Sequence, residues 1–167
     1  INTLEELVAN KASLKVGMVW KDSTSGGIVP TSQVLKAGIV SPENEFAFFE
    51  YLGSHQAALE ALLGSDIQVA GFALGVLKEK LETNPEVRKQ INMLWTSEAI
   101  PYGGLLCRSM IPSLCAKIKD ALLKNDSASQ AVLQGLKMGW PEFKTANQFV
   151  EIDSVYMRQL VAGMDSK

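Results

Sequence analysis

The chain has 167 residues, of which 47% are hydrophobic and 20% are charged, a composition typical of a globular protein rather than a disordered one. Sixteen basic residues against eighteen acidic ones leave a formal net charge of −2, which gives no basic excess for binding nucleic acid. Two cysteines and a single histidine, His55, are too few and too far apart for a structural zinc site.

The first third of the chain alternates between helical and strand patterns. Apolar residues at helical spacing predict a helix over residues 2–10, and a β-rich apolar run predicts a strand within 14–20. A polar turn over 22–27 ends in two glycines and leads into a helical stripe over 28–37. The resulting order is a strand, a loop rich in hydroxyl groups, and a helix.

The same order then repeats along the chain. The predicted elements are a strand at 46–51, a turn at 53–55, a helix at 56–63, a strand at 67–72, a helix at 74–81 and a strand at 92–95. Alternating strands and helices predict an α/β fold with a mostly parallel sheet of four or five strands and helices on both faces.

The pattern changes after residue 100. A strand fragment at 105–107 is followed by helices predicted at 111–123, 129–138 and 154–163, so this part is mainly helical. Cys107 and Cys115 lie at the strand end and in the following helix. Either a disulfide in an oxidising compartment or two buried free thiols fits this placement.

Ser23, Thr24, Ser25 and Gly26 form the most informative turn, because they lie between a strand and the start of a helix. Unpaired N–H groups at a helix start favour an anion, and hydroxyls add short donors that can surround a tetrahedral oxyanion. Gly26 allows the backbone to approach a ligand closely. The competing interpretation is an ordinary N-cap formed by one of the hydroxyls.

His55 occupies the equivalent strand-to-helix junction of the second unit in the pattern. Ligands in open α/β sheets bind at the carboxyl ends of the strands, so His55 is expected to donate to the same anion as the serine turn. A capping or surface histidine is the alternative. Trp20 precedes the serine turn, and either packing or a wall beside a ligand explains it.

Three segments together resemble the phosphate-, phosphite- and phosphonate-binding proteins of bacterial ABC importers. They are residues 16–38 with the Ser-Thr-Ser-Gly turn, residues 53–58 with the sequence Gly-Ser-His-Gln-Ala-Ala, and residues 95–103 with the sequence Trp-Thr-Ser-Glu-Ala-Ile-Pro-Tyr-Gly. They occur in the family's order within residues 1 to about 123, which is more specific than any one of them alone.

The resemblance implies a type II periplasmic-binding fold, in which two α/β lobes on a hinge close over a ligand. It implies that Ser23, Thr24, Ser25 and His55 contact phosphonate or phosphate oxygens. It also implies that this chain resembles the second half of such a protein, and a start at Ile1 suggests a mature or trimmed product. The expected segments are a hinge entry at 1–11, a ligand-binding lobe at 12–99, a crossover at 100–103 and a return segment of the first lobe at 104–167.

Two departures from the family's pattern bear on the ligand. Trp20-Lys21 stands where the family usually has Asp-Pro. Members that bind aminoalkylphosphonates have carboxylates at positions where this chain has Ala73-Leu74-Gly75 and residues 102–104 with the sequence Tyr-Gly-Gly. A ligand ammonium would find no counter-charge there, which favours phosphate, phosphite, a simple alkylphosphonate or another small oxyanion.

The expected function is therefore that of a solute-binding component of an ABC importer, without cofactor or metal. Its partners would be a small oxyanion, a permease and the N-terminal half of the same protein, in the periplasm or outside the cell, with a lipid anchor as one option. A sensor domain of a receptor or kinase with the same fold is the alternative. An α/β enzyme is disfavoured, because no nucleophile–base pair is visible in the sequence.

Overall fold

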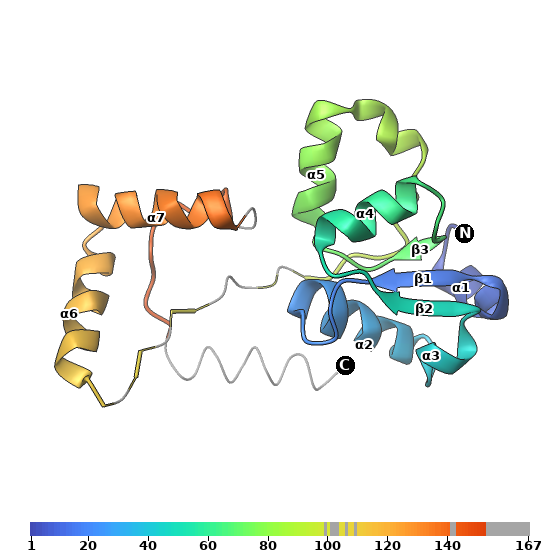
Figure 1. Ribbon diagram of the computed structural model, residues 1–167, viewed down its shortest axis with the longest axis horizontal. Coiled ribbons are helices and arrows are strands. Elements are labelled where there is room, and N and C mark those ends of the chain that lie inside the picture. The colour runs from blue at the N-terminus through green and yellow to red at the C-terminus, as the bar shows by residue number, and fades with distance from the viewer. Residues whose placement is uncertain (99, 101–103, 106, 109, 141–142, 153–167) are drawn as a thin grey trace. The chain divides into compact units, whose positions relative to one another are not determined.

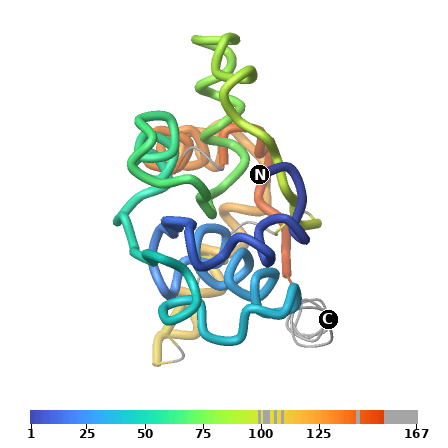
Figure 2. The backbone as a smooth tube through the Cα atoms, turned by 90° about the vertical axis from the view of Figure 1, so that its right-hand side faces the viewer, coloured from blue at the N-terminus to red at the C-terminus, as the bar shows by residue number. Residues whose placement is uncertain are grey.

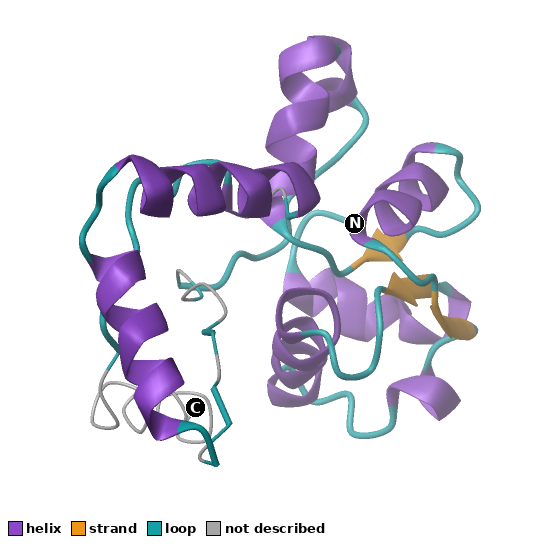
Figure 3. Ribbon diagram, turned by 60° about the vertical axis from the view of Figure 1, so that its left-hand side comes forward, coloured by secondary structure: helices purple, strands orange, loops and turns teal. Residues whose placement is uncertain are grey.

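The computed structural model describes residues 1–98, 100, 104–105, 107–108, 110–140 and 143–152. The chain divides into two compact units, unit 1 from Ile1 to Ile100 and unit 2 from Pro101 to Lys167. All strands of the described part belong to unit 1 (Figure 3).

Strands and helices of unit 1 alternate as the sequence predicts, apart from the short helix α3 Pro42–Glu45, which the sequence pattern did not indicate. They are α1 Leu4–Asn10, η1 Lys11–Ser13, β1 Lys15–Met18, η2 Thr24–Ile28, α2 Val29–Lys36, α3 Pro42–Glu45, β2 Phe48–Tyr51, α4 His55–Leu63, β3 Val69–Ala70, α5 Leu74–Thr83 and η3 Pro85–Lys89. The two helices described in unit 2 are α6 Pro112–Leu123 and α7 Ser127–Gly139.

The strands form a parallel sheet in the order β2-β1-β3. Val16 in the central strand lies opposite Phe49 on one side and Val69 on the other. Helices α2 and α3 cover one face of this sheet, while α4 and α5 lie toward the other (Figure 1). The predicted α/β class and parallel sheet are thus confirmed, and all three strands end at one edge.

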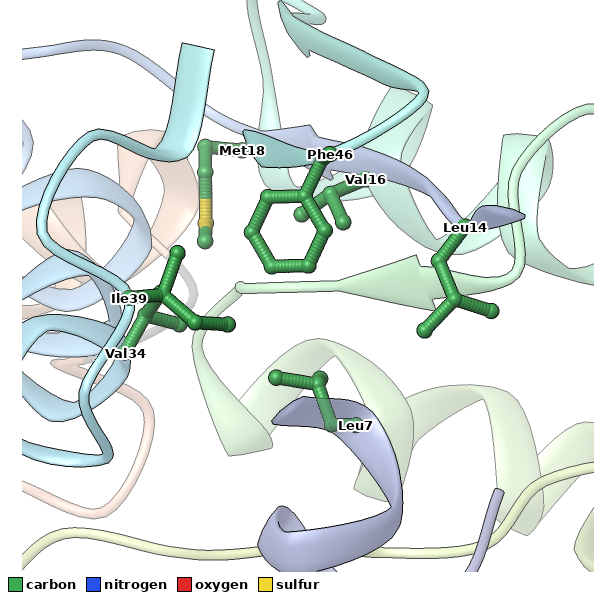
Figure 4. Packing of buried hydrophobic residues seen from close by; sticks show 7 residues of the cluster. All are labelled: Leu7, Leu14, Val16, Met18, Val34, Ile39 and Phe46. Atoms are coloured by element: carbon green, nitrogen blue, oxygen red, sulfur yellow. The ribbon is translucent and has the colours of Figure 1, made fainter. Parts of the chain in front are cut away.

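The principal core lies between the sheet and the helices α1 and α2 (Figure 4). Its buried side chains are Leu7, Leu14, Val16, Met18, Val34, Ile39 and Phe46. Alternate residues of β1 point to opposite faces, so Val16 and Met18 enter this core whereas Gly17 faces the other way. There Leu52 and Ile67 occupy the space that a side chain at Gly17 would need.

A smaller core lies beneath α4 and α5, where Leu59, Leu77 and Val87 are buried together. Helix α5 and the turn after it, coloured yellow-green in Figure 2, stand away from the sheet. In this second core α5 packs against Leu59 of α4, against Val87 of η3 and against Ile91 in the segment after η3.

The predicted sheet of four or five strands is wrong, since the structure has three within the described residues. Residues 92–95 form no strand: Leu94 packs against the principal core, but this segment makes no backbone pairing with another described segment. An apolar sequence becomes a strand only beside a partner ladder. The described residues of 105–107 form no strand either, and the helix predicted at 154–163 lies outside the described residues.

Unit 2 is helical and carries a disulfide between Cys107 and Cys115, which decides between the two alternatives left open by the sequence. Asp126 caps α7 by accepting hydrogen bonds from the backbone N–H groups of Ala128 and Ser129, at 3.1 and 3.0 Å. No helix in the described part of the chain is long and apolar enough to cross a membrane.

Candidate functional site

The candidate site lies where β1, β2 and β3 end and the next helices begin. The serine turn and η2 follow β1, His55 begins α4 after β2, and Ala73 precedes α5 after β3. Because the strands are parallel, these three junctions lie at one edge of the sheet. The expected meeting of the serine turn with His55 is observed.

Ser23 organises the serine turn. Its Oγ accepts a hydrogen bond from the N–H of Gly26 at 3.2 Å, and its carbonyl oxygen accepts from Gly27 and Ile28, each at 2.8 Å. The carbonyl of Thr24 accepts from the N–H of Val29, which is five residues further along the chain, as Ile28 is from Ser23. This spacing is that of a π-helix, so η2 forms one π-type turn before α2. Ser23 is thus the N-cap of this helix. The competing interpretation of the turn, an ordinary N-cap, therefore holds for one of the three hydroxyls.

The two glycines of the turn are required by close packing. A Cβ atom on Gly26 would overlap the side chain of Val19 and lie 2.9 Å from Cε1 of His55. A Cβ atom on Gly27 would overlap the carbonyl oxygen of Trp20. The glycine pair therefore lets the turn close over the end of β1 and lets the imidazole approach it.

Ser25 and His55 face each other across the site. Oγ of Ser25 lies 3.5 Å from Nε2 of His55, at the outer limit for a hydrogen bond, so the two polar atoms are direct neighbours. The other ring nitrogen, Nδ1, accepts a hydrogen bond from the backbone N–H of Ala73 at 3.0 Å. In the neutral imidazole this acceptor role assigns the proton to Nε2, the nitrogen that lies beside Oγ of Ser25.

The turn also leaves backbone donors available. No described residue accepts a hydrogen bond from the N–H of Thr24 or of Ser25, whereas the N–H groups of Gly26, Gly27 and Ile28 are bonded to Ser23. Thr24 is exposed and Ser25 is half-buried. Together with Oγ of Ser25 and Nε2 of His55, these N–H groups form a set of short donors suited to an oxyanion.

Sequence reasoning identified the side chains of this site but missed the group that orients His55. That group is a main-chain N–H at Ala73, 18 residues away, and no side-chain pattern indicates it. The only available signal is the strand end and helix start around residue 73, which matches the two junctions already identified.

The first residues of α5, which follow the junction at Ala73, carry no charge. Leu74 is exposed, and a Cβ atom at Gly75 would meet open space. Of the crossover positions compared in the sequence, residues 102 and 103 lie outside the described residues. Among the described residues, no group of three His, Cys, Asp or Glu side chains could hold a metal ion.

Comparisons with known proteins agree with this architecture. The profile of a family described as "ABC transporter, phosphonate, periplasmic substrate-binding protein" matches residues 1–148. The chain is 29% identical over 164 residues to the phosphonates-binding periplasmic protein of Escherichia coli K12, covering 96% of this chain and 46% of that protein.

A solved structure gives the same result. The crystal structure of a binding protein component of an ABC phosphonate transporter from Pseudomonas aeruginosa matches with a TM-score of 0.68 and 26% identity, covering 99% of this chain and 54% of that one. The chain thus spans about half the length of these two relatives. By the match over residues 1–148, it belongs to the family of periplasmic substrate-binding proteins of ABC phosphonate transporters.

Proposed function

We propose that this chain forms the oxyanion-binding part of a solute-binding protein of an ABC importer, and that its ligand is phosphate, phosphite, a phosphonate or a similar small oxyanion. The observation that carries the proposal is the convergence of Ser25 and His55, with the open N–H groups of Thr24 and Ser25, at one sheet edge. Neutral donors of this kind hold a desolvated anion without a basic side chain.

The three hydroxyls have different roles in this proposal. Ser25 donates directly to the anion opposite His55, and Thr24 donates through its backbone and its exposed hydroxyl. Ser23 uses an oxygen lone pair for the cap at Gly26, and its hydroxyl hydrogen remains available to a ligand oxygen.

We further propose that binding, and not catalysis, is the role of the site. A serine hydrolase needs an imidazole whose Nε2 accepts the serine proton while Nδ1 donates to an orienting group. His55 has the reverse arrangement, because its Nδ1 accepts from Ala73. Incubation of the protein with phosphoester substrates is expected to release no phosphate, and sustained release would contradict this assignment.

The complete binding protein is proposed to contain a second half that packs against unit 2. Helix α6 has no buried residue, and Ser129 and Leu133 are the buried residues of α7. Large apolar side chains of unit 2 are exposed, namely those of Leu105, Met110, Ile111, Leu114, Ile118, Val132, Met138, Trp140 and Val150. An apolar surface of this kind normally lies against a partner, and relatives about twice as long supply one by analogy.

The periplasm, or the outside of the cell, is the proposed location, and a transport permease is the proposed partner. The disulfide between Cys107 and Cys115 supports an oxidising compartment. One relative is described as a phosphonates-binding periplasmic protein and the other as a binding protein component of an ABC phosphonate transporter, which favours an importer over a sensor. Osmotic shock separates a free periplasmic protein from one retained by a lipid anchor.

Calorimetric titration of the full-length protein with phosphate, phosphite, methylphosphonate and sulfate tests the proposed function. Binding of at least one phosphorus oxyanion is expected. If none of the four anions binds, the oxyanion assignment is wrong and the serine turn is only a helix cap.

A further inference from the structure

Trp20 is an exposed aromatic side chain at the edge of the sheet that carries the candidate site. Its exposed fraction is 59%, although it directly follows the buried strand end at Val19. Its carbonyl oxygen accepts a hydrogen bond from the N–H of Ser23 at 3.1 Å, and Gly27 packs against the same carbonyl. The backbone of Trp20 is therefore part of the serine turn.

The indole of Trp20 is directed toward the second junction. Its Cζ2 atom lies 3.6 Å from the position that a Cβ atom would take at Gly53, two residues before His55. Gly53 has a φ of +87°, and its N–H donates to the carbonyl of Val19 at 2.9 Å, which holds the two junctions together. The backbone of Trp20 thus belongs to the turn that carries Ser25, while its ring lies beside Gly53 in the turn that carries His55.

The flank of the site at Ala73 is the start of α5, whose first residues are uncharged. The N–H of Ala73 holds His55, and the next side chain, Leu74, is 37% exposed. Lys21 and Asp22, the charged residues beside Trp20, are both exposed and opposite in sign. The Trp20 flank therefore carries no net charge, and its carboxylate at Asp22 is exposed to water beside a lysine.

We propose that Trp20 determines the specificity of this site, and that the ligand is a phosphonate whose substituent on phosphorus is an uncharged alkyl or aryl group. This inference rests on the proposed function, because the oxyanion end of such a ligand is held by Ser25 and His55. The indole and Leu74 lose water-exposed apolar surface when an apolar substituent covers them. An ammonium substituent must instead give up hydration beside a carboxylate, Asp22, that is exposed and adjacent to Lys21, and an exposed ion pair of this kind contributes little.

The opposing effect is attraction of an ammonium group to the indole face. That attraction is weak at exposed sites, where water competes for the cation. Propylphosphonate and 2-aminoethylphosphonate separate the two effects, because their substituents have similar length and differ in a terminal methyl against an ammonium group. Phosphite carries the oxyanion without any organic substituent and reports on the oxyanion subsite alone.

The experiment measures dissociation constants of these three probes by calorimetry in the full-length protein. Trp20→Ala removes the ring, Trp20→Phe keeps an aromatic surface, and Lys21→Ala is the matched control at an adjacent exposed residue. Wild type is expected to bind propylphosphonate about 10-fold or more tightly than 2-aminoethylphosphonate. Trp20→Ala is expected to lower propylphosphonate affinity about 10-fold while changing phosphite affinity less than about twofold.

Trp20→Phe is expected to retain most of the affinity for propylphosphonate, and Lys21→Ala to leave the ratio of propylphosphonate to phosphite affinity unchanged. Circular dichroism verifies that each variant is folded. Tighter binding of 2-aminoethylphosphonate than of propylphosphonate overturns the inference. Equal losses for phosphite and propylphosphonate in Trp20→Ala, or no loss for either, also overturn it. If phosphite and both phosphonates fail to bind wild type, the inference is overturned; the proposed function is wrong as well only if phosphate also fails to bind.

Discussion

Ser23 and Ser25 provide a matched pair that separates capping from ligand binding. Both are half-buried serines of one turn, and each is changed to alanine by the loss of a single oxygen. Ser23 accepts the capping bond from Gly26, whereas Ser25 makes only the 3.5 Å contact with His55. Ser23→Ala is therefore expected to lower stability, whereas Ser25→Ala is expected to lower affinity and leave stability almost unchanged.

The magnitudes follow from these contacts. Loss of a serine N-cap lowers the free energy of unfolding by about 1 kcal/mol. Loss of a hydrogen bond to a charged, desolvated ligand lowers the binding free energy by about 1.5–3 kcal/mol, or about 10- to 100-fold in affinity. Ser25→Ala should change the free energy of unfolding by less than about 0.5 kcal/mol, because it removes no short intramolecular bond. Thr24→Val should likewise lower affinity without unfolding the protein.

The assay combines two measurements on the full-length protein. Urea unfolding gives the change in stability, and calorimetric titration with phosphite and methylphosphonate gives the change in affinity. The expected result is that Ser23→Ala lowers the free energy of unfolding, whereas Ser25→Ala lowers the affinity and leaves the free energy of unfolding almost unchanged. If Ser25→Ala lowers stability by about 1 kcal/mol and leaves affinity unchanged, Ser25 is a structural residue and the assignment of the donors is refuted.

Three further predictions concern stability. Gly27→Ala should destabilise unit 1 by about 3 kcal/mol or more in urea unfolding, because the added Cβ atom would overlap the carbonyl oxygen of Trp20. The control is Gly135→Ala on α7, where a Cβ atom meets open space and the change should be neutral or stabilising. Backbone N–H groups, that of Ser129 foremost, lower the pKa of Asp126. The charged carboxylate of Asp126 therefore contributes to the free energy of unfolding above about pH 4, and this contribution is lost as pH falls through the pKa of the folded state. Asp126→Asn should keep the cap and reduce the dependence of the free energy of unfolding on pH in this acidic range. An unchanged dependence of stability on pH in this variant would contradict the prediction. Reduction of the disulfide between Cys107 and Cys115 should cost unit 2 about 2.5 kcal/mol, and unaltered thermal unfolding in reductant would refute this.

Local sequence spacing determined a large part of this fold. Apart from the short helix α3, the order of strands, turns and helices from Lys15 to Thr83 was predictable because each element depends on apolar periodicity and on its own turn residues. The placement of Ser23, Thr24, Ser25 and His55 at strand-to-helix junctions followed from the same local patterns. Parallel strands then require that such junctions meet at one sheet edge.

Tertiary packing decided what local patterns leave open. Residues 92–95 are apolar enough for a strand, yet their backbone pairs with no described strand, and Leu94 packs against the principal core instead. Cys107 and Cys115 were compatible with thiols or a disulfide until their backbones were placed. The number of strands and the bonding of cysteines depend on neighbours in space, which spacing along the chain does not specify.

The division of roles within the site was also decided only by the three-dimensional arrangement. Three consecutive hydroxyls look equivalent in sequence, but the bond from Gly26 makes Ser23 the cap and leaves Ser25 facing His55. The proton position of His55 is set by a main-chain N–H at Ala73, and a backbone N–H has no signature in the sequence. Residue types therefore determined which chemistry is available, whereas hydrogen bonds between distant segments determined which group performs it.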